Sequence, residues 1–196
     1  MKQLSSRVGI LKKLRKYLPP ARLRIIFEGV FSSKLMYGMT VWGRIWGIPG
    51  SMDVDQNTRQ SPTVTKEDVR KLQVLQNKCM RIMTDSDYQT PTRTLLAKTN
   101  LLSVHQQMAH LSLCQVFNIQ KTKLPSYHYN RLFTDVETGI RPNRIEYQSS
   151  LARSHFFYQS SRLWGALPDS IVSSDTKQNF KKMCKKWIKS NIMEKP

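Results

Sequence analysis

The sequence predicts a mainly α-helical protein, an irregular helical bundle with long loops and a basic C-terminal helix. Apolar residues recur at helical spacing in several segments, and Ser or Thr residues stand where helix N-caps are expected. Stretches rich in Pro, Gly and polar residues separate these segments. With 196 residues, of which 39% are hydrophobic, the chain is long enough for one core. We therefore expect one domain, with a helical region over 1–121 and, packed on it, a connecting segment and basic helix over 122–196.

The first two helices are predicted on either side of a proline pair. Apolar residues at helical spacing, with basic residues between them, predict an amphipathic helix from Ser6 to Leu18. Pro19 and Pro20 stop it, and Pro20 suits the first turn of a second helix that runs to about Trp42. Four aromatic residues on this second helix are interpreted as core rather than as a base-stacking platform: Phe27, Phe31, Tyr37 and Trp42.

The middle of the chain predicts a loop and three further helices. Residues 48–64 are polar and rich in turn formers, which indicates an exposed loop. Thr65 resembles the N-cap of an amphipathic helix with a basic outer face. Thr90 before Pro91 begins a short helix to about Thr99. Ser103 and Gln106 form a capping box for a longer helix to about Lys121, whose burial the pattern leaves undecided.

The C-terminal third begins with a segment that has no clear period. From Lys123 to Arg153 the pattern indicates an extended stretch, whose tyrosines and arginines either stack on bases and bind phosphates or fix a long loop to the core. A short aromatic segment follows over residues 155–163. Ser174 is the expected N-cap of a final helix from about Asp175 to Asn191, which carries the densest positive charge in the chain.

Charge points to a polyanionic partner. Lysine and arginine total 32 against 13 acidic residues, which gives a net charge of +19. Neutralising phosphates and releasing their counterions would drive binding, so RNA, DNA or an RNA–DNA hybrid is the expected partner. Contact with an anionic membrane or a ribosome is also compatible with this composition. The apolar stretch from Leu23 to Ile48 is interrupted by charges, and no signal peptide is recognised, so we expect an intracellular protein, nuclear or cytoplasmic, without membrane insertion.

The candidate phosphate contacts lie on three of the predicted helices. On each helix, the alternative to phosphate contact is a basic face that is only exposed to solvent. The last helix also resembles a membrane-surface helix or a localisation signal. The candidates are Lys12, Lys13, Arg15, Lys16, Lys71, Lys78, Arg81, Lys181, Lys182, Lys185 and Lys186.

The residues needed for independent catalysis are not recognised in the sequence. Polymerases and nucleases hold divalent cations with clustered carboxylates, and this chain has no Asp-Asp pair. His105 and His110 are five residues apart on one helix, off a common face, so no metal site is predicted. The cysteines, Cys79, Cys114 and Cys184, are expected to be buried and reduced. No glycine-rich phosphate loop occurs, and we expect no cofactor, no small-molecule substrate and no catalytic residue.

Five segments, taken in order, carry a resemblance to a known family: LKKLRKYLP (Leu11–Pro19), KLMYGMTVWG (Lys34–Gly43), KLQVLQNKCMRIMT (Lys71–Thr84), TPTRTLLAKTNLLSV (Thr90–Val104) and SRLWGALPDSI (Ser161–Ile171). They resemble the region after the palm of non-LTR (LINE-type, jockey-like) retrotransposon reverse transcriptases. With the lysine-rich C-terminal helix that follows them, the resemblance extends over nearly the whole chain.

The resemblance implies a helical, thumb-like region that grips template and primer behind a polymerase site. The fingers, the palm with its aromatic-Ala-Asp-Asp motif, and the endonuclease are absent from this chain, so we expect no enzyme activity from it alone. One alternative is a scaffold that docks on a polymerase palm through exposed apolar residues near Phe31, Tyr37 and Trp42. Another is a non-functional relic of a retroelement.

Overall fold

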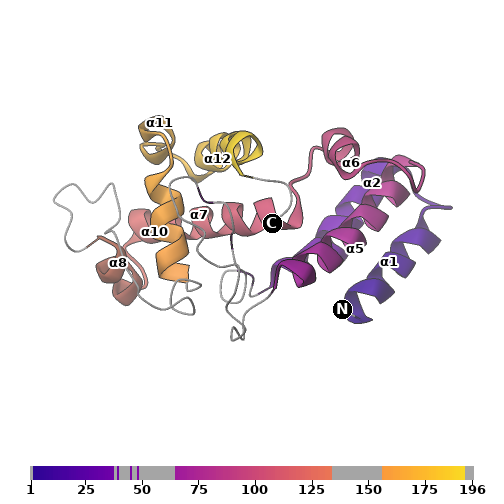
Figure 1. Cartoon of the computed structure of the whole chain (residues 1–196), viewed down its shortest axis with the longest axis horizontal. Helices are drawn as coiled ribbons and strands as arrows, with labels where there is room; N and C mark the ends of the chain where they lie inside the picture. Colours follow the sequence, from indigo (N-terminus) through magenta and orange to yellow (C-terminus); the bar gives the residue numbers. More distant parts are fainter. Residues whose placement is uncertain are drawn as a thin grey trace.

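The computed structural model of the chain describes residues 2–37, 39, 45, 48, 65–133 and 156–192. These residues are mainly helical, which confirms the predicted fold class (Figure 1). In chain order the elements are α1 (Lys2–Leu14), α2 (Pro20–Ile26), the π-helical η1 (Phe27–Ser32), α3 (Ser33–Met36), α5 (Lys66–Thr84), α6 (Thr92–Thr99), α7 (Val104–Thr122), α8 (Ser126–Phe133), α10 (Phe156–Gly165), α11 (Asp169–Val172) and α12 (Lys177–Asn191).

The helices form two neighbouring groups around one continuous core. In Figure 1, α1, α2, α5 and α6 lie together at the right, and α8, α10, α11 and α12 surround α7. Helix α5 packs against α1, α2 and α6, whereas α7 packs against α8, α10 and α12, and the two long helices α5 and α7 contact each other. Buried apolar side chains of both groups belong to the same cluster. Helix α7, whose burial the sequence left undecided, is buried along most of its length.

The first helix begins and ends earlier than predicted. It was expected over Ser6–Leu18, but α1 spans Lys2–Leu14 and the residues before Pro19 form turns. The backbone N–H of Tyr17 bonds to the Leu14 carbonyl, three residues back. A proline disfavours helical backbone in the residue before it, which is consistent with the early end of α1.

The second helix also ends earlier than predicted and contains a π-helical segment. Tyr37 is extended (φ −60°, ψ 121°), so the helix stops at Met36 rather than near Trp42, which lies outside the described residues. Phe27 and Phe31 are buried with ring centroids 5.3 Å apart, which confirms them as core. Tyr37 is 78% exposed, so its assignment to the core was wrong. Phe31 is fully buried and cannot belong to an exposed docking patch.

Both predicted capping motifs in the middle of the chain are present. The Thr65 hydroxyl accepts from the Asp68 backbone N–H (3.1 Å), and the Asp68 carboxylate accepts from the Thr65 N–H (3.1 Å). Ser103 and Gln106 form the same reciprocal pair at the start of α7. The N-cap of α6 is Pro91 rather than Thr90, because the Pro91 carbonyl accepts the first bond of the helix, from the Leu95 N–H (3.2 Å). Of the predicted loop, residues 49–64 lie outside the described residues, and Ile48 is buried.

Replacing Thr65 with alanine is expected to destabilise the protein by about 1 kcal/mol, the usual effect of losing an N-cap side chain. The Thr65 hydroxyl and backbone lower the pKa of the Asp68 carboxyl. A lowered pKa in the folded state stabilises the fold above the pKa of the unfolded chain, and this contribution disappears as pH falls through the folded pKa. The T65A effect, measured by urea unfolding, should therefore shrink under acidic conditions. An effect that does not change with pH would contradict this coupling.

The C-terminal third differs from its prediction in three places. Residues 126–133 form helix α8 rather than an extended stretch, with Leu132 and Phe133 buried, and residues 134–155 lie outside the described residues. The short helix α11 was not predicted. Ser174 does not cap the last helix, because its hydroxyl donates to the Ile171 carbonyl (2.7 Å). The N-cap of α12 is Thr176, whose hydroxyl accepts from the Asn179 N–H (3.3 Å).

Candidate nucleic-acid interface

Helix α12 presents lysines on one side and a buried apolar edge on the other. Phe180, Cys184 and Ile188 follow each other at intervals of four residues and are fully buried against α7 and its neighbours. The helix also carries six lysines, all exposed except Lys185, which is half-buried. They are Lys177, Lys181, Lys182, Lys185, Lys186 and Lys189. Of the four residues predicted to bind phosphate on this helix, Lys182, Lys185 and Lys186 line one hollow of the surface, and Lys181 lies outside that lining.

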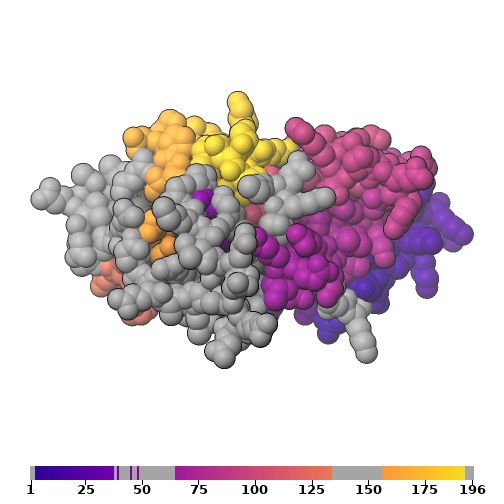
Figure 2. Space-filling model, in the orientation of Figure 1, coloured from indigo at the N-terminus to yellow at the C-terminus, as the bar shows by residue number. Residues whose placement is uncertain are grey.

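Two of these lysines are held by the turn that ends α6. Lys185 Nζ donates to the Asn100 backbone carbonyl (2.7 Å), and Lys189 Nζ donates to the Asn100 side-chain oxygen (2.6 Å). Asn100 can occupy this place because it ends α6 with a left-handed backbone (φ 52°), which asparagine tolerates. Figure 2 shows the surface of α12 beside that of α6 along one edge of the molecule.

The lysines of α12 have no ion-pair partner among the described residues. Burial lowers the pKa of Lys185, and the nearby cations Lys189 and Arg24 lower it further, while Glu28 opposes them. Glu28 is itself paired with Arg24 (3.1 Å). A group of cations that repel one another favours the approach of a polyanion.

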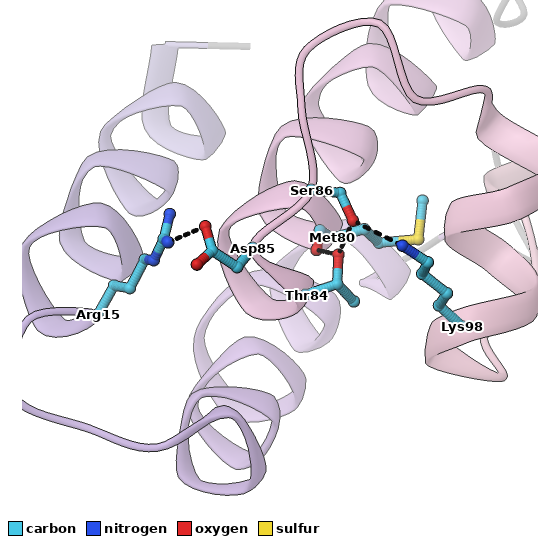
Figure 3. Close-up of polar contacts among 6 residues, drawn as sticks. All are labelled: Arg15, Met80, Thr84, Asp85, Ser86 and Lys98. Atoms are coloured by element: carbon cyan, nitrogen blue, oxygen red, sulfur yellow. Dashed lines mark hydrogen bonds and ion pairs between the residues drawn. The ribbon is translucent and has the colours of Figure 1, made fainter.

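Of the four cations predicted near the N-terminus, on α1 and in the turn after it, one forms an ion pair with another helix and three are exposed. Lys12, Lys13 and Lys16 are exposed. Arg15 instead forms an ion pair with Asp85, the residue that ends α5, so it ties α1 to α5 (Figure 3). The same figure shows the turn after α5 fixed from the other side, where Lys98 Nζ donates to the Ser86 hydroxyl (3.3 Å). Arg15 therefore has a structural contact that its neighbouring lysines lack.

Of the three cations predicted on α5, one is bonded to other parts of the protein and two are exposed. Lys71 and Lys78 are exposed. The Arg81 guanidinium donates to the backbone carbonyls of Asp87 (3.2 Å) and Thr90 (3.1 Å), and it lies over the Tyr88 ring at 5.3 Å from the centroid. Arg81 thus holds the connection between α5 and α6. Since α1 packs on α5 and α12 packs on α7, the structure places the predicted cations in two parts of the molecule.

The candidate phosphate contacts predicted from the sequence did not include Lys189, and they gave no sign of its contact with Asn100. Lys189 continues the lysine pattern of α12 and could have been included from the sequence. Asn100 is separated from Lys189 by 89 positions, and no local pattern indicates their hydrogen bond.

The structure offers a histidine and a cysteine in contact, but not an activated pair. Cys114 Sγ lies 3.8 Å from His110 Nε2. Burial raises the pKa of the Cys114 thiol to about 11 and lowers the pKa of His110. At neutral pH the thiol is therefore protonated and the imidazole neutral, which is the opposite of the thiolate–imidazolium pair that a nucleophilic cysteine needs. Cys79, Cys114 and Cys184 are all free and buried, as predicted.

The part of the chain that the structure describes contains neither a candidate metal site nor a candidate membrane-spanning helix. No group of three or more His, Cys, Asp or Glu residues is placed there to hold a metal ion. No helix among those residues combines the length and apolarity needed to cross a membrane.

Comparison with known proteins gave no relative for this chain. No protein-family model, no curated protein and no solved structure matched it.

Proposed function

We propose that this chain binds nucleic acid through its phosphates, without strong sequence preference. The observation that carries the proposal is the α12 face, where lysines stand in a row and no carboxylate of the described residues pairs with them. Lysine ammonium groups contact phosphates as point charges and do not read base edges, so binding of this kind is insensitive to sequence.

The resemblance to the post-palm region of non-LTR reverse transcriptases supports RNA or an RNA–DNA hybrid as the preferred ligand. We infer a thumb-like module that grips template and primer and contributes no catalytic group of its own. Two features agree with this inference: the exposed lysines of α1 and of the turn after it, and the ion pair between Arg15 in that turn and Asp85 at the end of α5. A polymerase palm is then the partner that would supply the chemistry.

Binding should fall steeply as salt rises, and it should weaken when the α12 lysines are removed. We expect the variant K181Q/K182Q/K185Q/K186Q to bind roughly 10–100-fold more weakly at low salt, because the variant makes fewer phosphate contacts and its binding therefore releases fewer counterions. Its slope of log affinity against log salt should be less steep by up to about 3. Fluorescence anisotropy with RNA, single-stranded DNA, duplex DNA and a hybrid, each over a salt series, measures both quantities.

The control for this experiment changes the same helix without changing its charge. Gln178 is exposed on α12, and Q178A should leave the affinity and the slope unchanged. Weak, equal binding of the wild-type chain to every polyanion would contradict the proposal. Preference for a hybrid or RNA would support the thumb-like role, and unchanged affinity of the quadruple variant would exclude α12 from it.

A further inference from the structure

The α12 lysines line a hollow that is closed on one side by the end of α6. The hollow has a volume of about 500 Å³. Asn100 contributes from the turn after α6, and every other lining residue comes from α12. The lining residues are Asn100, Asn179, Lys182, Met183, Lys185, Lys186 and Lys189.

A second, smaller hollow adjoins the first at Lys189. Its volume is about 170 Å³, and it is lined by residues of α6, of the segment after α6, and of the start of α7, together with Lys189. These residues are Arg93, Leu96, Ala97, Leu101, Gln106 and Lys189. Lys189 lines both hollows, and we call the two hollows together the α6–α12 crevice. Its walls come from segments separated by some 80 residues in the sequence, and Figure 2 shows their surfaces adjoining.

Each hollow has cations in its lining besides the shared Lys189. Arg93 lines the smaller hollow, and three further lysines of α12 line the larger one. Among the described residues, no carboxylate lines either hollow. Like charges held this closely repel one another, and that repulsion is relieved when an anion enters. The electrostatics therefore favour an extended anion over a single compact one, since the cations follow the crevice from one hollow into the next.

The hydrogen bonds to Asn100 leave most of the binding capacity of the lysines available. An ammonium group has three N–H donors, and Lys185 and Lys189 each use one of them on Asn100. The acceptors on Asn100 are neutral, so the positive charges remain uncompensated. Both ammonium groups are thus fixed in position before a ligand arrives, which lowers the conformational entropy that binding would cost.

We propose that the α6–α12 crevice holds the sugar–phosphate backbone of one nucleic-acid strand, with successive phosphates on either side of Lys189. The proposal rests on the nucleic-acid binding proposed above and names the ligand form and the residues. A duplex is too broad to enter hollows of this size, whereas a single strand can lie along them. Among the residues that the structure describes, no aromatic side chain lines either hollow, so we infer a contact to the backbone rather than stacking of bases.

The test compares two variants that remove the same charge from different surfaces. The crevice variant is R93Q/K182Q/K186Q, which spares Lys185, Lys189 and their hydrogen bonds to Asn100. The matched control is R22Q/K34Q/K66Q, which removes three exposed cations from α2, α3 and α5 that have no part in the proposed binding surfaces. Binding of each to an oligouridine single strand and to a mixed-sequence duplex is measured by fluorescence anisotropy over a salt series, and circular dichroism checks that each variant is folded.

We expect the crevice variant to bind the single strand about 10–30-fold more weakly, with a salt slope less steep by about 2, because three phosphate contacts are lost. Its affinity for the duplex should change less than about threefold, because a duplex does not enter the crevice and so does not contact the substituted residues. The control variant should weaken single-strand binding much less than the crevice variant does.

Different outcomes separate this inference from the proposed function. If the wild-type chain binds with a steep salt slope but both variants weaken single-strand binding equally, the crevice is not the strand site, and general nucleic-acid binding stands. A crevice variant that loses duplex and single-strand affinity to the same extent overturns the strand preference. If the wild-type chain shows no salt-dependent binding, the proposed function fails and the inference fails with it.

Discussion

Replacing Trp164 with alanine is expected to lower the free energy of unfolding by about 3–5 kcal/mol, the range for removing a large buried aromatic side chain. Trp164 is fully buried, and its ring stacks on Phe180 with centroids 5.5 Å apart. Phe180 in turn stacks on Phe117 with centroids 4.3 Å apart. These three rings come from α10, α12 and α7. The tryptophan therefore stabilises the junction of three helices, and its removal leaves a cavity at their centre.

The experiment is urea unfolding followed by circular dichroism, with Y17A as the control. Tyr17 is 80% exposed in the turn after α1, so its removal should change the stability by no more than about 0.5 kcal/mol. An expected loss of 3–5 kcal/mol is a large share of the total stability of a domain, and W164A should be partly unfolded near physiological temperature. A W164A protein as stable as Y17A would show that the three rings do not hold the helices together.

This aromatic stack also positions the basic helix. Phe180 occupies the first turn of α12, and Cys184 and Ile188 continue its buried edge. A loss of packing at Trp164 would free that edge and allow α12 to move away from α7 and from Asn100. The nucleic-acid affinity of W164A should then fall in proportion to the unfolded fraction, whereas a direct contact of Trp164 with the ligand would reduce it without unfolding.

The sequence predicted well those features that depend on residues close together in the chain. The capping box of Thr65 and Asp68 depends on residues three positions apart, as does that of Ser103 and Gln106, so a short window contains the whole signal. The amphipathic character of α12 was also clear, because its buried residues and its lysines alternate within four turns. The helical fold class was predictable for the same reason.

What the sequence did not predict depends on segments that meet only in the folded chain. Arg15 and Arg81 look like their basic neighbours in sequence, yet one pairs with Asp85 and the other bonds to the carbonyls of Asp87 and Thr90. A count of charges cannot separate cations used by the fold from cations left for a ligand. The same holds for Asn100, whose contacts to α12 make the crevice possible.

The second large effect is expected at Gln106, which joins the start of α7 to the end of α12. Its side-chain oxygen accepts from the Ser103 N–H (3.2 Å), completing the capping box, and its Nε2 donates to the Ile192 carbonyl (3.0 Å). Gln106, Ser103 and Ile192 are all buried. In Q106A the Ser103 N–H and the Ile192 carbonyl would lose these partners in places that water does not reach, and a buried polar group without a partner costs about 1–3 kcal/mol.

We therefore expect Q106A to be destabilised by about 2–4 kcal/mol, since two buried groups are affected and relaxation of the surrounding structure fills part of the cavity. Urea unfolding measures this loss, and Q178A, which removes an exposed glutamine from α12, is the matched control. Hydrogen exchange gives a second readout, because the bond to Ile192 fixes the last turn of α12. Amides near Ile188 should exchange faster in Q106A than those in the middle of α5. If both variants are equally stable and exchange alike, the end of α12 is held by its apolar packing alone.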